Sequence, residues 1–302
     1  MSLSVPRLHT FLSSFWDALT AAGGLIAHAH MAPIAIALAI FLGGFAIVGC
    51  RWRLILGALG CQATFWDTTL TYAAGVCIGN VTPARLIGAD AFRIAVIRAR
   101  TGITTRLATA SVVYDRGSEA PVIAVLALLA LSRLRAWAAG AVAVIVVVLV
   151  VVPPLRRALA ARFTSWHEAL VGVKVRRDSI VAAVAWATLL YLQDTTRIFL
   201  IARAFNIWLT PTQAATMTVL RLIGGAAPIP GGVGVVEGSQ IGGLVLFGIP
   251  AETATAITIV ERAILYVGGT AIGAVALALL GGRSLVTRSA SEASTSREHA
   301  PR

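Results

Sequence analysis

Long apolar segments make up most of this chain, and they constrain its fold more than any other feature of the sequence. A helix rises 1.5 Å per residue, so about 20 apolar residues cross the hydrocarbon core of a bilayer. Hydrophobic residues make up 58% of the chain and charged residues 13%, whereas a soluble domain is about 25% charged. The sequence therefore predicts an all-α polytopic membrane protein. The apolar segments are 11–30, 33–56, 64–82, 86–99, 104–132, 136–153, 178–204, 210–228, 232–248 and 252–281.

Two pairs of these segments are joined by proline and glycine at points where the chain is still apolar. Proline removes a backbone donor and glycine relaxes the backbone, so each break ends a helix. Broken backbone at membrane depth is tolerated only where protein or water satisfies its polar groups. We therefore expect two re-entrant helical hairpins, each entering and leaving on one side. The breaks contain Pro83 and Gly88 in the first pair and Pro228, Pro230, Gly231, Gly232 and Gly234 in the second.

The remaining segments predict about six full transmembrane helices, and the basic residues orient them. The linker 154–177 carries a cluster of Lys and Arg, which places it in the cytoplasm. Both termini then lie on the cytoplasmic side of a bacterial inner membrane, in a multi-pass topology. Three crossings separate the two hairpins, and because this number is odd, the hairpins enter from opposite sides. The linker itself fits either an interfacial amphipathic helix or a solvated cytoplasmic loop.

An internal repeat supports this arrangement. Several glycines and charged residues recur at a spacing of 146 residues: Gly102 and Gly248, Asp115 and Glu261, Arg116 and Arg262, Arg51 and Arg197. Repeat 1 covers about 34–133 and repeat 2 about 180–281, so the fold is expected to be an inverted repeat. Residues 1–282 then form a single integral-membrane domain. The polar tail 283–302 is expected to be disordered in the cytoplasm.

Arg116 and Arg262 lie inside helices that must cross the bilayer. An unpaired arginine at such a depth costs about 3 kcal/mol, so each must face a partner or a watery cavity. Asp115 and Glu261 are adjacent to them, but neighbours in a helix point about 100° apart, so a salt bridge would run between elements, for example across the two repeats. Two interpretations remain open. The charges are an inert lock between the repeats, or they form a site for an anionic headgroup, because guanidinium suits bidentate phosphate recognition.

Further charges flank the two hairpin breaks. The second half of a re-entrant hairpin begins near the membrane midplane, where its free N–H groups favour an anion. Glu237 in that position caps the helix, pairs with Arg221, or binds and releases a proton. The candidate substrate-binding residues are Arg116, Arg262, Arg221, Glu237, Asp90 and Arg93, and the candidates for charge pairing or proton coupling are Asp115, Glu261 and Glu237.

Arg197, the repeat counterpart of Arg51, is a weaker site candidate. Arg197 follows Asp194 by three residues, which predicts an ion pair within one helix. Arg51 lies near the end of its segment, so we expect it to snorkel toward the membrane surface.

Other functional classes find little support. Cys50, Cys61 and Cys77 form no CxxC motif and the five histidines are scattered, so no metal site, cofactor or disulfide framework is expected. The net charge of +12 comes from residues beside apolar runs, where they set topology and face anionic lipid, so no nucleic acid is expected as a partner.

The second repeat reads PIPGGVGVVEG, then GIP and ITIVERAILY, and the first contains GADAFR and a YDR triplet. Over about residues 34–281 this pattern resembles the lysylphosphatidylglycerol synthase transmembrane-region family. The first repeat departs from it, with Tyr114-Asp115-Arg116 where members more often show Glu-Arg, and with an extra residue between Pro83 and Gly88. The resemblance implies a lipid flippase, since bifunctional members carry aminoacyl transfer in a separate soluble domain that we do not expect here. Stand-alone relatives are associated with hopanoid or other polyprenoid lipid pathways, and some have been called glycosyltransferases.

These observations lead to one functional expectation and two alternatives. We expect a lipid flippase or transporter, not an enzyme, that moves an anionic or phosphate-bearing lipid (polyprenoid, hopanoid or aminoacylated) across the inner membrane by alternating access. The first alternative is an intramembrane polyprenyl-phosphate-dependent glycosyltransferase with Asp90, Glu237 or Asp115 as base. The chain has no phosphate-binding glycine loop with lysine that would favour it. The second is a noncatalytic partner of a lipid-biosynthesis enzyme. The expected partners are membrane lipids and such an enzyme.

Overall fold

The structure is a computed structural model, and it describes residues 20–82, 85–151, 164, 166–168, 170–173, 175–227 and 229–281. Every regular element in these residues is a helix, so the predicted all-α fold is confirmed for them. Most of the linker 154–177, the tail 283–302 and the break residues Pro83 and Pro228 lie outside the described residues.

We call residues 20–151 the first half and residues 175–281 the second half. After a short helix at 20–27, the first half contains α2 (Met31–Ala58), α3 (Phe65–Val81), α4 (Arg85–Thr101) and α5 (Thr105–Val151). The second half contains α7 (Arg177–Ala204), α8 (Pro211–Gly225), the 3-10 turn η1 (Pro230–Gly232), α9 (Val235–Leu246), α10 (Ala251–Arg262) and the π-helix η2 (Ala263–Gly268), which continues as α-helix to residue 281.

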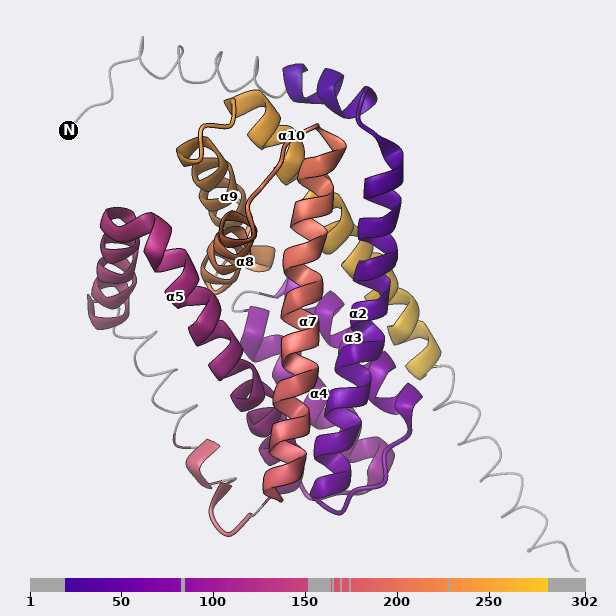
Figure 1. Ribbon diagram of the computed structural model, residues 1–302. Helices are drawn as coiled ribbons and strands as arrows, with labels where there is room; N and C mark the ends of the chain where they lie inside the picture. The colour runs from indigo at the N-terminus through magenta and orange to yellow at the C-terminus, as the bar shows by residue number, and fades with distance from the viewer. Residues whose placement is uncertain are drawn as a thin grey trace, which may run out of the picture.

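The segments 104–132 and 136–153 form one helix instead of two, so that prediction was wrong. The stretch between them contains two arginines but no glycine or proline, and charged residues do not interrupt backbone hydrogen bonding. Figure 1 shows that α5 turns sharply at the left of the view, so its two ends run in different directions.

The same capping motif begins α3 and α8. Thr64 Oγ1 accepts a hydrogen bond from the Asp67 N–H at 3.1 Å, and the Asp67 side chain accepts one from the Thr64 N–H at 3.2 Å. Thr210 and Gln213 make the same exchange at the start of α8. Each capping box satisfies backbone donors that the first turn leaves free. Since Thr64 and Thr210 are 146 residues apart, the repeat extends to the start of each hairpin.

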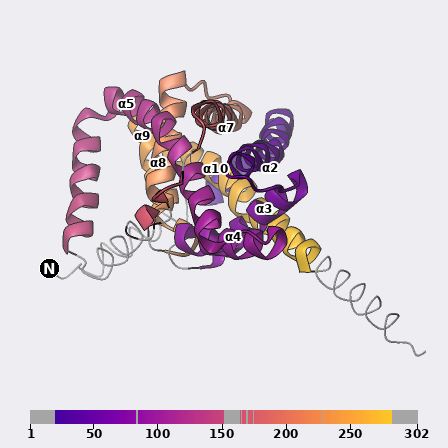
Figure 2. The same cartoon turned by 90° about the horizontal axis from the view of Figure 1, so that it is seen from below.

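The two hairpins occupy different ends of the molecule. Figure 1 shows α3 and α4 in the lower half of the view and α8 and α9 in the upper half. α2 runs downward and α7 upward, and these two helices lie side by side in both views (Figures 1 and 2). Each of α3 and α4 has 17 residues, a length of about 26 Å, while α2 and α7 have 28.

Glycines mark the break in the second hairpin but not in the first. Gly231, Gly232 and Gly234 have φ angles of 60°, 65° and 84°, a backbone region that other residues rarely adopt, and the chain changes direction there. Gly88 lies inside α4, where its missing side chain leaves room for Thr82: a Cβ atom would lie 2.4 Å from Thr82 Oγ1. The first hairpin therefore turns before Gly88.

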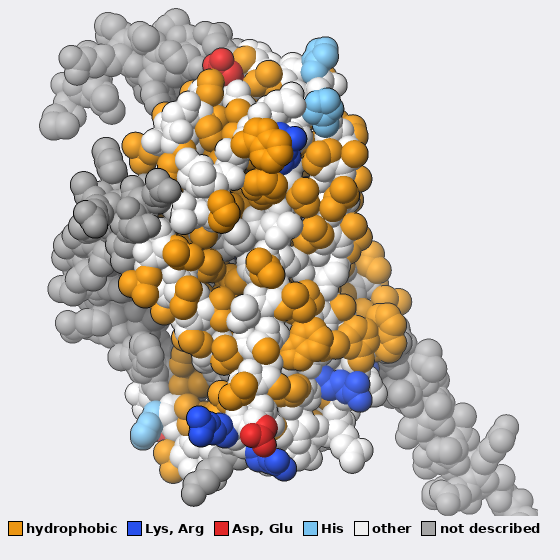
Figure 3. Space-filling view, viewed as in Figure 1, with side chains coloured by type: hydrophobic (Ala, Val, Ile, Leu, Met, Phe, Trp, Pro, Cys, Tyr) orange, Lys and Arg blue, Asp and Glu red, His pale blue; other side chains and the backbone are white. Residues whose placement is uncertain are grey.

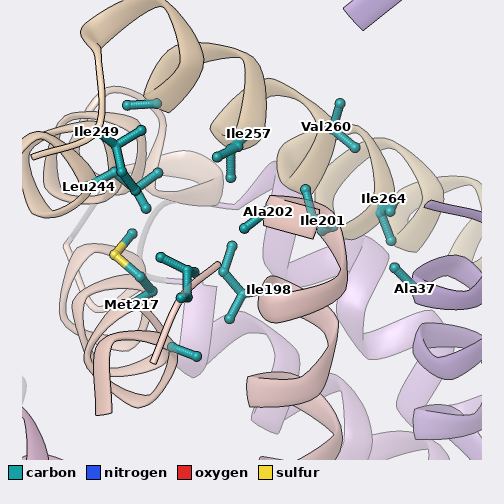
Figure 4. Close-up of a cluster of buried hydrophobic side chains, with 13 residues drawn as sticks. Ala37, Ile198, Ile201, Ala202, Met217, Leu244, Ile249, Ile257, Val260 and Ile264 are labelled. Carbon is teal, nitrogen blue, oxygen red and sulfur yellow. The ribbon is translucent and has the colours of Figure 1, made fainter. Parts of the chain in front are cut away.

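The largest apolar core lies between α7, α8, α9 and α10. Ile198, Met217, Leu244 and Ile257 are fully buried there and point toward one another (Figure 4). In lipid such a core is stabilised by van der Waals packing more than by exclusion of water. Small residues let other helices approach closely: a Cβ atom at Gly273 would lie 2.5 Å from the backbone oxygen of Ala73.

The outer surface suits contact with lipid. Figure 3 shows hydrophobic side chains over the middle of one face and most of the visible Lys and Arg side chains at its lower end. Two described helices, Met31–Ala58 and Ala251–Gly281, are long and apolar enough to cross a membrane.

Candidate functional site

Asp115 is the centre of a buried ion network in the first half. Its Oδ1 accepts a hydrogen bond from Arg51 Nε on α2 at 2.8 Å, and its Oδ2 accepts one from Arg93 Nη2 on α4 at 2.7 Å. All three side chains have at most 1% of their surface exposed. Arg51 therefore does not snorkel as expected, because its helix turns it inward against α5. One carboxylate thus holds α2 and α4 against α5.

Glu119, one turn further along α5, extends this network. Its Oε1 lies 2.5 Å from Arg51 Nη2, and its Oε2 lies 3.7 Å from Arg116 Nη1. Tyr191 on α7 donates its hydroxyl to the same Oε2 at 3.4 Å. Arg116 in turn donates to Asp90 Oδ1 on α4 at 2.9 Å.

A second ion network occupies the second half. Glu261 Oε1 lies 3.5 Å from Arg197 Nη2 and 3.8 Å from Arg221 Nε. Both arginines also donate to Asp194, so the ion pair expected between Asp194 and Arg197 is present. As in the first half, an acid on the helix that follows the hairpin is shared by two arginines.

Glu237 pairs with Arg262, not with Arg221. Arg262 Nε lies 2.7 Å from Glu237 Oε1, and Arg262 Nη2 donates to the carbonyl of Gly231 at 3.1 Å. Glu237 Oε2 accepts the N–H of Gly234 at 2.6 Å, so it also caps the start of α9. Glu237 therefore both caps α9 and forms an ion pair, and its partner is Arg262 instead of Arg221.

The two networks use corresponding residues. The pairs Arg51–Asp115 and Arg197–Glu261 each join residues 64 positions apart. The pair Arg116–Asp90 has an approximate counterpart in Arg262–Glu237, since Arg116 and Arg262 are 146 residues apart but Asp90 and Glu237 are 147 residues apart. Among the described residues, each ion pair of the two networks joins partners within one half. These charges therefore do not form a salt bridge between the repeats. The first network contacts the other half through the hydrogen bond that Tyr191 on α7 donates to Glu119.

Arg116 and Arg262 share one cavity of about 450 Å³. The wall includes aromatic and aliphatic side chains such as Phe41, Tyr72 and Leu190. Its charged members are Arg93, Arg116, Arg221, Arg262, Glu119 and Asp194. The acids Asp90, Asp115, Glu237 and Glu261 are not part of the wall, and each is bound to an arginine that is. The described cavity surface therefore carries four guanidinium groups and two carboxylates, an excess of positive charge.

Tyr266 lies where the two hairpins meet at this cavity. Its hydroxyl donates to the carbonyl of Asn80 at the end of α3 at 3.4 Å, and its ring covers Gly231 in η1. The guanidinium carbon of Arg262 lies 4.8 Å from the centre of the same ring, a distance at which cation–π attraction acts. Tyr266 belongs to the π-helix η2, a local irregularity often found at functional sites.

The structure thus brings all six candidate substrate-binding residues into one cavity wall or into ion pairs with its arginines. It also adds residues that the sequence reasoning missed, namely Asn80, Glu119, Tyr191 and Tyr266. Glu119 had a usable signal, since it lies three residues after Arg116 on the same helix and therefore on a similar face. In the part of the chain that the structure describes, no group of His, Cys, Asp and Glu is arranged to hold a metal ion.

Long apolar helices enclosing buried ion pairs define a helical membrane protein. Within that class the chain belongs to the family of the lysylphosphatidylglycerol synthase transmembrane region, whose model matches residues 10–273. It is also similar to the UPF0104 membrane protein MJ1595 of Methanocaldococcus jannaschii. The two are 21% identical over 270 residues, which is 78% of this chain and 80% of that protein. The family predicted from the PIPGG and VER motifs is therefore confirmed.

Proposed function

We propose that this protein moves a lipid with an anionic, phosphate-bearing headgroup between the leaflets of a bacterial inner membrane. The observation that supports it most is the cavity shared by Arg116 and Arg262, with its excess of guanidinium groups. A buried guanidinium offers a phosphate paired hydrogen bonds and full charge, and both are strong where water is scarce. The lipid would be a phospholipid or a polyprenoid, hopanoid or aminoacylated lipid.

The cavity size fits a headgroup better than a whole lipid. Small-molecule sites in proteins have volumes of about 300–1,000 Å³, and this cavity has about 450 Å³. Its aromatic and aliphatic wall would let the acyl or prenyl chains remain in the surrounding bilayer while the headgroup contacts the arginines.

The arrangement of the halves suggests how the headgroup changes sides. We propose an inverted repeat with about six crossings, in which α3–α4 and α8–α9 are re-entrant hairpins from opposite faces. Their positions in opposite halves of Figure 1 support this reading. The lower end, where most visible Lys and Arg lie in Figure 3, would be cytoplasmic. The described chain begins at residue 20 near the upper end of Figure 1 and runs toward the lower end at residue 281, so a cytoplasmic N-terminus requires a further crossing before residue 20. Rocking of one half against the other would then open the cavity to each leaflet in turn.

A transport role also fits the carboxylates better than catalysis does. A general base must reach its substrate, but Asp115 is enclosed by Arg51 and Arg93 and is not part of the cavity wall. Asp90 and Glu237 are bound by Arg116 and Arg262 and are likewise absent from the wall, although the Glu237 side chain is 31% exposed. We therefore propose a protein without enzymatic activity, whose partners are membrane lipids and a lipid-biosynthesis enzyme that supplies them.

Leaflet exchange in proteoliposomes tests this function. The assay would use phosphatidylglycerol with a fluorescent acyl chain, which an external reductant quenches only in the outer leaflet. We expect protein-dependent exchange that falls at least about tenfold in Arg116→Gln and Arg262→Gln, because one charge-assisted hydrogen bond contributes about 1.5–3 kcal/mol. Arg176→Gln is the matched control, since Arg176 is 82% exposed and pairs only weakly with Asp178.

The chemical form of the lipid must be followed in the same vesicles. Mass spectrometry should find the phosphatidylglycerol unchanged. Exchange no faster than in protein-free vesicles would contradict transport, and a modified lipid would support an enzyme instead.

A further inference from the structure

The charges that face the cavity include several that break the internal repeat. A step of 146 residues takes Glu119 to Leu265, Arg221 to Gly75 and Asp194 to Val48. These three uncharged counterparts also line the cavity. The two halves therefore contribute corresponding positions to the wall but different charges. The wall therefore combines the matched arginines Arg116 and Arg262 with charges that occur in one half alone.

We propose that Glu119 takes up a proton when an anion binds Arg116, so that ligand binding in the cavity is coupled to protonation. This inference rests on the proposed function, because it takes the cavity as the site of an anionic headgroup. It assigns the coupling to a residue that differs from the three acids suggested by the sequence. Asp115 and Glu261 are at most 2% exposed and Glu237 caps α9, and none of them belongs to the cavity wall.

Glu119 and Asp194 are the carboxylates in the described wall of the cavity, and they are held differently. Asp194 accepts close hydrogen bonds from both Arg197 and Arg221, one on each oxygen. Glu119 is bound tightly only through Oε1, by Arg51 at 2.5 Å. Its Oε2 has a 3.4 Å hydrogen bond from Tyr191 and lies 3.7 Å from Arg116. Oε2 of Glu119 is therefore the oxygen that most easily exchanges a cationic neighbour for a proton.

The surroundings of Glu119 are charged on every side. Arg51 on α2, Arg116 on its own helix and Tyr191 on α7 contact it, and Tyr72 on α3 lies close enough to interact with its charge. Asp90 and Arg93 on α4, Asp115 on α5, Asp194 on α7 and Arg221 on α8 interact in turn with these neighbours. Without a ligand, Oε2 faces the guanidinium of Arg116 and the hydroxyl of Tyr191. An anion on Arg116 would bring a like charge to within a few ångströms of Oε2 and would occupy the guanidinium that Oε2 faces. Like charges at such distances favour the protonated acid.

Protonation would then help to hold the anion. Removing one negative charge from the wall leaves four guanidinium groups facing one carboxylate and the ligand. By thermodynamic linkage, an anion that promotes proton binding must itself bind more tightly when the proton is present. Tyr191 connects this carboxyl group to α7 of the other half, so a change at Glu119 reaches both halves.

Ligand binding at different pH values tests the proposal without requiring transport. The probes are dihexanoyl phosphatidylglycerol and its free headgroup, glycerophosphoglycerol, added to purified full-length protein in detergent. A phosphodiester does not titrate between pH 5.5 and 8.5, so a pH dependence belongs to the protein. We expect the lipid to bind more tightly as pH falls, by up to tenfold per pH unit where one proton is taken up. In weakly buffered solution, about one proton should be taken up per lipid bound. If glycerophosphoglycerol binds with the same pH dependence, the anionic headgroup alone is sufficient for proton-linked binding. If it binds more weakly than the lipid, the acyl chains also contribute to the affinity.

Glu119→Gln should bind the lipid tightly and independently of pH, because the amide resembles the protonated acid. Glu119→Leu places at 119 the residue type of its repeat counterpart and provides a second neutral variant if the amide does not fold. Glu252→Gln, at an exposed position in the first turn of α10, is the control and should keep the pH dependence of the unmodified protein. Thermal unfolding of each variant checks its fold.

Two results would overturn the proposal: pH-independent binding without proton uptake in the unmodified protein, or an unchanged pH dependence in both Glu119 variants. The outcome is distinguishable from failure of the proposed function. Proton-linked binding without leaflet exchange would leave Glu119 coupled to an anion site in a protein that does not transport. Leaflet exchange with pH-independent binding would support transport and reject the role of Glu119.

Discussion

The ring of Tyr266 lies so close to Gly231 that a Cβ atom added to the glycine would be 2.2 Å from Tyr266 Cε2. This contact brings the break of the second hairpin against the helix that lines the cavity. Gly231 also has a φ of 60°, so two independent features require glycine there.

Gly231→Ala should therefore destabilise the protein. The left-handed backbone alone costs a residue with a side chain about 1–2 kcal/mol, and displacement of Tyr266 adds to this. Thermal unfolding in detergent measures the loss. Gly238→Ala is the control, because Gly238 lies inside α9 with no heavy atom within 4 Å of its virtual Cβ, and alanine is the better helix former. Equal stability of the two variants would contradict the close contact.

Asp115→Asn should be among the most damaging single substitutions. It leaves Arg51 and Arg93 buried while removing the carboxylate they share, and breaking a buried ion pair costs about 3–5 kcal/mol. The yield and melting temperature of folded protein provide the measurement. Asp178→Asn, which removes the acid of an exposed pair with Arg176, should change stability by about 0–1 kcal/mol. A mild effect at both positions would mean that water reaches Asp115.

The two capping boxes should contribute equally. Thr64→Ala and Thr210→Ala each remove the hydroxyl that accepts a backbone N–H at the start of a hairpin helix. Each should cost about 1 kcal/mol in thermal unfolding. Thr188→Ala provides the comparison, because that exposed threonine bonds only to the preceding turn of α7 and its replacement should have little effect.

Leu265→Glu should weaken anion binding by about tenfold or more. The substitution adds a carboxylate to the cavity at the repeat counterpart of Glu119 and reduces its positive excess. Leu265→Gln has the same size without the charge and should bind dihexanoyl phosphatidylglycerol nearly as well as the unmodified protein. If the two variants bind equally, the charge of the wall does not attract the ligand.

The sequence was sufficient for the fold class and for locating the important charges. The length of the apolar segments predicted helices, and the 146-residue spacing identified Arg51 and Asp115 as related to their counterparts Arg197 and Glu261. The proline and glycine cluster at 228–232 predicted a chain reversal, and Gly231 and Gly232 have positive φ angles at that reversal. These features are local or periodic, so they can be read without knowing which helices touch.

The partners of the charges could not be predicted in the same way. Glu237 was weighed against Arg221 but binds Arg262, and Arg51 was expected at the membrane surface but is fully buried. In a soluble helix the apolar face shows which side points inward. Here nearly every face is apolar, so the rotation of each helix depends on packing against its neighbours. Glu119 was missed for the same reason, since only the approach of Arg51 and Tyr191 gives it a role.

The confinement of the ion pairs to each half has a mechanical consequence. The first network contains Arg51, Arg93 and Arg116 with Asp90, Asp115 and Glu119, and the second contains Arg197, Arg221 and Arg262 with Asp194, Glu237 and Glu261. Each is electrically neutral on its own. Pulling opposite charges apart in a medium of low dielectric constant requires much work, but sliding one neutral body past another does not. If the halves move as proposed, their own charges would stay paired, and the hydrogen bonds that such a shift would break include those of Tyr191 with Glu119 and of Tyr266 with Asn80.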